Sequence, residues 1–283
     1  MAVDVLAEQL AGLDALEAAV ERGQGRGRRL WAATWPKLLA VAVSLAFWQA
    51  VAWSGWRPSY VLPGPAEVLG EVGSLLGDAV FWDAVGITIR RAITGYAVAL
   101  VVGVAVGLAV ARSKVLRAAT GSLITGLQTM PSIAWFPFAI LLFQLSEEAI
   151  LFVVVLGAAP SIANGLVGGI DQVPPLYRRA GRVLGARGLQ LDRHVVVPAA
   201  LPSFVTGLKQ GWAFAWRSLM AGELLVLMGT PSLGSRLQYA RELADAPLLL
   251  ALMLVVLAIG IAVDTVFSSV DTRLRRRRGL LVE

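Results

Sequence analysis

Long apolar runs separated by short polar intervals restrict the fold of this chain more than any other feature. The runs cover about 38–53, 85–111, 115–143, 149–170, 198–228 and 246–270. A helix needs about 20 apolar residues to cross a bilayer, and helices satisfy their own backbone hydrogen bonds in lipid. A content of 57% hydrophobic and 16% charged residues fits the same class. We therefore expect an all-α, polytopic membrane protein with six transmembrane helices.

Basic residues are unequally divided between alternate intervals. With the N-terminus inside, 19 of the 25 lysines and arginines fall on the inner side, and the outer side carries Arg57, Arg90, Arg91, Arg236 and Arg241. This bias predicts a multi-pass protein of the cell membrane with both termini in the cytoplasm. The expected organisation is a cytoplasmic N-terminal tail (1–37), a transmembrane domain (38–270) and a basic cytoplasmic C-terminal tail (271–283).

The net charge of +6 comes from short basic clusters between apolar runs. Such clusters suit anionic lipid headgroups, so membrane lipids are expected partners and nucleic acid is not. The absence of cysteine excludes disulfides and thiolate ligands, and one histidine makes a histidine-based metal site improbable. We therefore expect no metal site.

The polar interval 171–202 stands out among the apolar runs. Pro174 and Pro175 suit the first turn of a helix, and an apolar stripe follows at helical spacing, formed by Leu176, Ala180, Val183 and Leu184. Gly185 stands where a left-handed residue would end this helix, and Gly188 allows a second turn. From the residues alone, this segment is either a basic loop that fixes topology or a short amphipathic docking helix.

The same interval resembles the signature loop of ABC-importer permeases, which runs Glu-Ala-Ala, three residues, Gly, nine residues, Ile-x-Leu-Pro. Here Arg179-Ala180-Gly181 corresponds to the first part, Gly185 to the glycine, and Val195-x-Val197-Pro198 to the end. An arginine, Arg179, stands where the family has its acidic residue. The surrounding residues are similar to the branch that imports sulfonates, taurine, nitrate or bicarbonate.

The resemblance implies a type I ABC importer permease fold, with 171–198 as the coupling loop. Two permease copies would form a homodimer, bind an ATP-binding cassette ATPase dimer and receive solute from an external binding protein, moving it by alternating access. The residues that would contact the ATPase are Leu176, Arg179, Ala180, Gly181, Leu184, Gly185, Val195, Val197 and Pro198.

ATP and magnesium would belong to the partner ATPase, with no cofactor in this chain. The lysines here, Lys37, Lys114 and Lys209, do not follow glycine, so the sequence has no P-loop. We expect a permease subunit, not an enzyme. Aliphatic sulfonate is the expected solute, and taurine, nitrate, bicarbonate or a vitamin precursor are the alternatives.

Arg217 falls within an apolar run, where a charged side chain is costly unless it faces protein or water. Two interpretations stay open: a buried ion pair or clamp between helices, and a pore-lining contact for an oxyanion, which suits the planar guanidinium. Glu223 is six residues further and lies on another face, so it is interpreted as structural or as a gate. Trp135, in a stretch that resembles the family's proline-aromatic motif, completes the expected substrate path.

Two other classes of membrane protein differ from this sequence in the residues they require. An ion-coupled secondary transporter would carry carboxylates within its spans and often an inverted repeat, and neither is evident. A membrane-embedded enzyme would need a nucleophile and base or a metal constellation, which the sequence also lacks. The ATP-driven importer is therefore the expected function, and the secondary transporter is its alternative.

Overall fold

The computed structural model describes residues 26–226 and 229–277, which divide after Glu67 into two compact units. The first unit contains α2 (Arg26–Trp53) and the segment that follows it. Trp48 donates a hydrogen bond from Nε1 to the carbonyl of Pro63 at 3.1 Å, which fixes that segment against the helix. The first 25 residues of the expected N-terminal tail lie outside the described residues.

The second unit is entirely helical in its described residues. Helix α3 (Pro65–Leu76) continues into it from the first unit. The remaining elements are α4 (Ala79–Arg112), α5 (Lys114–Thr129), a 3-10 turn (Ser132–Trp135), α6 (Phe136–Phe143), α7 (Glu147–Asp171), α8 (Pro175–Val183), α9 (Leu189–Leu191), a π-turn (Asp192–Val196), α10 (Val197–Leu225), α11 (Leu233–Glu242) and α12 (Ala246–Arg277).

Local sequence explains where several of these helices begin and end. The side chain of Asp78 accepts a hydrogen bond from the amide of Val80 and caps α4. Ser113 ends α4 and caps α5. Pro131 separates α5 from the turn and α6, and the two parts of this segment are bent by 102°. Pro131 therefore interrupts the third apolar run, whereas Pro160 lies inside α7 without ending it.

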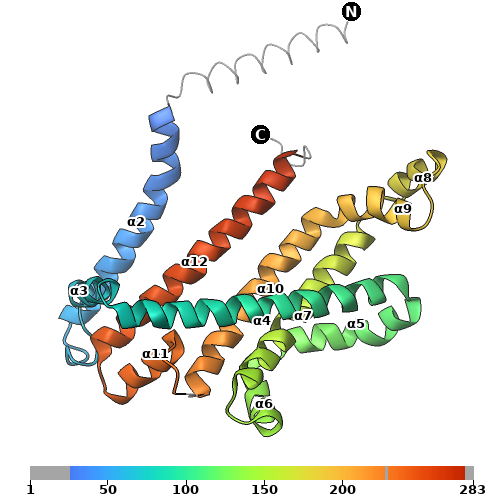
Figure 1. Ribbon diagram of the computed structural model, residues 1–283. Helices are drawn as coiled ribbons and strands as arrows, with labels where there is room; N and C mark the ends of the chain where they lie inside the picture. Colours follow the sequence, from blue (N-terminus) through green and yellow to red (C-terminus); the bar gives the residue numbers. More distant parts are fainter. Residues whose placement is uncertain (1–25, 227–228, 278–283) are drawn as a thin grey trace, which may run out of the picture. The chain divides into compact units, whose positions relative to one another are not determined.

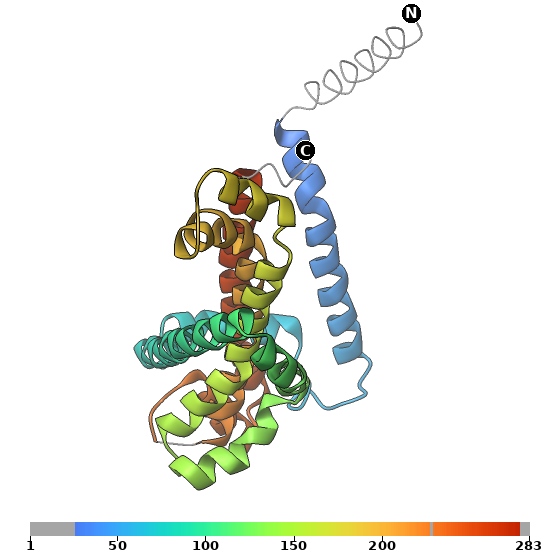
Figure 2. The same cartoon turned by 90° about the vertical axis from the view of Figure 1, so that its right-hand side faces the viewer.

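Close helix contacts in the second unit depend on glycine. A Cβ atom added at Gly165 of α7 would lie 2.5 Å from the Cα atom of Gly207 of α10, so only two glycines allow this crossing. One added at Gly103 of α4 would lie 2.8 Å from the carbonyl oxygen of Ala159. Both crossings therefore require a residue without a Cβ atom. Figures 1 and 2 both show α4 lying across α7 and α10.

Four described helices are long and apolar enough to cross a membrane, or five if the bent pair formed by α5 with the turn and α6 is one span. They are α2, from Thr34, together with α4, α7 and α12. Helix α10 has 29 residues but carries Lys209, Arg217 and Glu223, and it is not among them. By this criterion the structure supports an all-helical membrane protein with four or five spans, fewer than the six expected.

Candidate functional site

Helix α8 and the turn after it form a well-defined cap at one end of the second unit, where α8 and α9 project beyond α7 and α10 (Figure 1). Gly185 has a φ of +89°, the left-handed conformation expected for it. Its amide donates to the carbonyl of Arg182 at 3.0 Å, and the amide of Ala186 donates to that of Gly181 at 2.9 Å. These two bonds are the Schellman pattern that ends a helix.

Gly181 shows why a small residue is needed inside this cap. A Cβ atom there would lie 2.6 Å from Cδ1 of Leu191 and 3.0 Å from Cγ2 of Val195. Helix α8 therefore packs directly on α9 and the π-turn, while Arg178 donates to the carbonyl of Ile170 at the end of α7. The segment thus packs as an extension of the helices beneath it.

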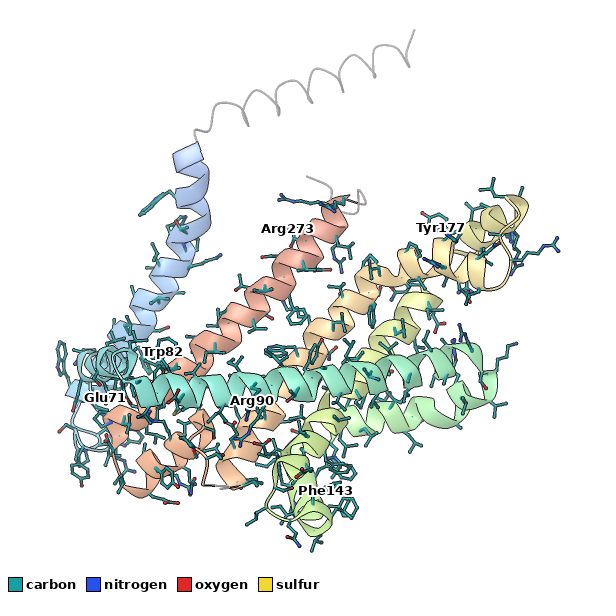
Figure 3. All side chains as sticks on the ribbon, in the orientation of Figure 1. Glu71, Trp82, Arg90, Phe143, Tyr177 and Arg273 are labelled. Carbon is teal, nitrogen blue, oxygen red and sulfur yellow. The ribbon has the colours of Figure 1, made fainter. Side chains whose placement is uncertain are left out.

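The apolar stripe of α8 faces away from the chain. Leu176 is 69% exposed and Leu184 is 86% exposed, and Tyr177 also lies on the projecting helix in Figure 3. Arg179, Ala180 and Val197 are exposed as well, whereas Val195 and Pro198 are partly buried. An exposed apolar stripe between arginines is a surface suited to a protein partner.

Arg217 lies in the wall of a cavity of about 330 Å³ between α10, α7 and the broken segment after α5. Trp135 lines the same cavity, as do Phe214 and the polar side chains of Gln128 and Ser132. This volume is at the lower end of the range for small-molecule pockets, about 300–1,000 Å³. Two of the three expected substrate-path residues are therefore together.

The guanidinium of Arg217 keeps most of its hydrogen-bonding capacity. Its Nε donates to the carbonyl of Ala213 at 3.0 Å, and its Cζ lies 4.8 Å from the ring centroid of Phe214. No carboxylate within the described ranges forms an ion pair with it. The expected alternative of a buried ion pair therefore finds no partner in this part of the chain.

Glu223 lies elsewhere, in a buried polar cluster that links α4, α10 and α11. Its carboxylate accepts hydrogen bonds from Nη1 of Arg91 at 3.1 Å, from Oγ1 of Thr88 at 2.9 Å and from the amide of Gly234 at 3.1 Å. Arg91 also reaches Oε1 of Glu147 at 2.8 Å. Arg91 is 4% exposed and Glu223 1%, so both charges are removed from solvent and matched to each other.

The burial of Arg91 differs from its expected place among the basic residues of the outer side. Its neighbour Arg90 is exposed, and the two adjacent arginines look alike in sequence. A useful signal was present, since Arg91 lies within an apolar run and intramembrane arginines require a partner. Gln128 was also missed because its role depends on contacts with α7.

The family of the chain is decided by comparison with known sequences. The model of a family described as binding-protein-dependent transport system inner membrane component matches residues 99–277. The chain belongs to this family. It is an ABC transporter permease, a multi-pass inner membrane component and not itself an ATPase. Permeases of ABC importers assemble with an ATPase and a binding protein. This result sets aside the ion-coupled secondary transporter.

Individual relatives agree with this assignment. The nitrate import permease of Synechocystis sp. is 32% identical over 66% of this chain and 70% of its own length. The taurine transport permease of Escherichia coli is 27% identical over 83% of this chain and 86% of its own length. Among solved structures, a chain of the inward-facing methionine ABC transporter MetNI matches with a TM-score of 0.57 and 18% identity. That match covers 69% of this chain and 96% of the other, and it shows the fold.

Proposed function

We propose that this chain is the transmembrane subunit of an ATP-driven importer for a small oxyanion, with aliphatic sulfonate as the first candidate. Taurine carries a sulfonate and nitrate is an oxyanion, so the two named relatives transport solutes with related chemistry. The observation that carries the proposal is the guanidinium of Arg217, which lines a cavity without a carboxylate partner among the described residues. A guanidinium presents a planar set of donors to such an anion.

Two permease copies, an ATPase dimer and a solute-binding protein form the proposed assembly. We assign α8 as the coupling helix, because its exposed Leu176 and Leu184 offer apolar surface on a cap held rigidly by Gly181. Movement of the ATPase would then be transmitted to α7 and α10 without loss in the intervening loop. Glu223 is proposed to be structural, because its contacts join three helices.

The proposed topology has six spans with both termini in the cytoplasm. Helix α10 is the additional span, since its 29 residues correspond to about 43 Å of helix, enough for a bilayer core of about 30 Å. Arg217 of this helix lines a cavity, and water or solute in such a cavity lowers the cost of a charge at that depth.

The test is uptake by the assembled transporter in proteoliposomes with and without ATP, using taurine, nitrate and ethanesulfonate as probes. Arg217→Gln should assemble and hydrolyse ATP but lose most uptake, whereas Arg217→Lys should keep part of it because the charge remains and the planar fork is lost. Unchanged uptake by Arg217→Gln would refute the role of this residue. ATP-independent uptake by the parent transporter would refute the importer mechanism.

A further inference from the structure

A second cavity of about 330 Å³ lies between α5, α7 and α10, on the side of the Arg217 cavity toward the start of α10. Gln128 lines both cavities. The second cavity is otherwise bounded by glycines and by polar uncharged side chains, namely Ser161, Asn164, Gln172, Ser203, Thr206 and Gln210. Its described lining therefore contains hydrogen-bonding groups but no ionised side chain.

The two cavities follow one face of α10. Ser203, Gln210 and Arg217 are separated by intervals of seven residues, which is close to two helical turns and about 10 Å. The polar face therefore extends about 21 Å from Arg217 to Ser203, near the cap that contains α8. Such a face within a membrane helix marks a water-filled or solute-filled path.

Gln128 is held at the boundary between the cavities. Its Nε2 donates to Oγ of Ser161 at 2.8 Å, and its Oε1 accepts from Nδ2 of Asn164 at 2.6 Å. Both ends of the amide are thus engaged by α7. Gln128 is therefore fixed in the wall shared by the two cavities, between the Arg217 cavity and the uncharged second cavity.

The second cavity has hydrogen-bond donors that can bind a solute. The side-chain amide of Gln210 has no hydrogen-bond partner among residues 26–226 and 229–277. In the side-chain amide of Gln172, Oε1 accepts a hydrogen bond from Oγ of Ser203 at 2.9 Å, and Nε2 is free to donate. At the margin, Arg275 reaches Thr206 at 3.3 Å, but its Nε is 2.9 Å from the carboxylate of Asp271. The carboxylate of Asp271 therefore neutralises the guanidinium of Arg275.

We propose that the second cavity is a release site, in which uncharged amides and hydroxyls take over the transported oxyanion from Arg217. The inference rests on the proposed function, because Arg217 supplies the preceding contact. Hydrogen bonds from neutral donors to an anion are charge-assisted on the acceptor side only, and the second cavity lacks the direct Coulomb attraction of a guanidinium. Affinity for an anion therefore falls from the first cavity to the second, and a solute must be held weakly at the last site to leave.

The absence of cysteine from the chain allows a direct test in the complete transporter, assembled with its ATPase in lipid nanodiscs. The probes are two thiol reagents of similar size, sulfonatoethyl methanethiosulfonate and its trimethylammonium analogue. Ser132→Cys samples the first cavity, and Ser203→Cys and Gln210→Cys sample the second. Mass spectrometry of the permease chain measures each rate, divided by the rate of the same reagent with 2-mercaptoethanol.

Val266→Cys is the matched control. Val266 is 62% exposed on α12, two residues from Ser268, which accepts a hydrogen bond from Lys209 beside Gln210. It lies at a similar depth but faces outward, where hydrocarbon suppresses the reactive thiolate. We expect slow modification at this position by both reagents and fast modification at the two second-cavity positions.

Charge preference distinguishes the two cavities. At Ser132→Cys the sulfonate reagent should react several-fold faster than the ammonium reagent after normalisation, and Arg217→Gln should abolish this preference. At Ser203→Cys and Gln210→Cys both reagents should react at comparable normalised rates, with or without Arg217. Exclusion of the sulfonate reagent from these positions, or reactivity no greater than at Val266→Cys, would overturn the release site.

Uptake measured on the same preparations separates this inference from the proposed function. ATP-driven uptake of a probe anion together with unreactive second-cavity cysteines would refute the release site alone. Reactive cysteines with the expected charge pattern, but without ATP-driven uptake of any probe anion, would refute the proposed oxyanion import and leave the two-cavity path.

Discussion

Replacing Arg91 by methionine should strongly destabilise the permease. Arg91→Met removes the cation that neutralises Glu223 and leaves the carboxylate with hydrogen bonds from Thr88 and Gly234. Removing one member of a buried ion pair typically costs about 3–5 kcal/mol. The converse change, Glu223→Met, should cost less, about 1.5–3 kcal/mol, because Arg91 keeps its contacts to Glu147.

The double variant provides the decisive comparison. Arg91→Met combined with Glu223→Met leaves no buried charge, so it should be less destabilised than Arg91→Met alone, which requires a coupling energy larger in magnitude than the cost of Glu223→Met, that is, more than about 1.5 kcal/mol. The neighbouring Arg90→Met is the control, because Arg90 is exposed and surface changes are usually within about 0.5 kcal/mol.

The assay is unfolding of the purified permease as the SDS fraction of mixed micelles rises, followed through the fluorescence of its nine tryptophans. The expected order of stability is parent and Arg90→Met first, then Glu223→Met and the double variant, and Arg91→Met last. Strictly additive effects of the two single changes would refute the ion pair as the source of stability. Equal losses in Arg90→Met and Arg91→Met would show that burial does not distinguish these arginines.

Three further changes test other parts of the structure. Gly185→Val should abolish coupling between ATP hydrolysis and uptake, because the left-handed backbone conformation at this position disfavours a β-branched side chain. Gly185→Asn should retain coupling, and equal uptake by both variants would contradict the assignment of α8. Gly207→Leu should prevent folding by separating α10 from α7, and Gly168→Ala, which adds a Cβ in open space, should not; gel filtration of both distinguishes them. A cysteine at Leu145 should be labelled from outside and one at Arg276 only after permeabilisation, and the reverse pattern would overturn the topology.

The fold class and the shape of the α8 segment were predictable because they depend on local signals. Apolar run length predicted the membrane helices, and two prolines with Gly185 predicted the start and end of α8. The residues of α10 were harder to interpret because their charges reduce its hydropathy, and a count by composition leaves this helix out of the spans. Helix length and charge alone therefore do not determine the number of spans.

Polar partners could not be predicted from sequence. Arg91 and Glu223 are 132 residues apart, and no periodicity connects them. Gln128 similarly meets Asn164 through the packing of α5 on α7. Arg217 was identifiable as a costly charge, but whether it faced a carboxylate or a cavity depended on the rotation of α10. Tertiary packing decides such questions, and one sequence holds little information about it.

The separation of Arg91 from Glu223 also has a consequence for biosynthesis. At about 5–20 residues per second, a ribosome needs about 7–26 s to add the 132 residues between them. During this interval α4 has been made while the carboxylate that neutralises its arginine does not yet exist. A nascent chain that stops before residue 223 thus carries a guanidinium without its buried partner.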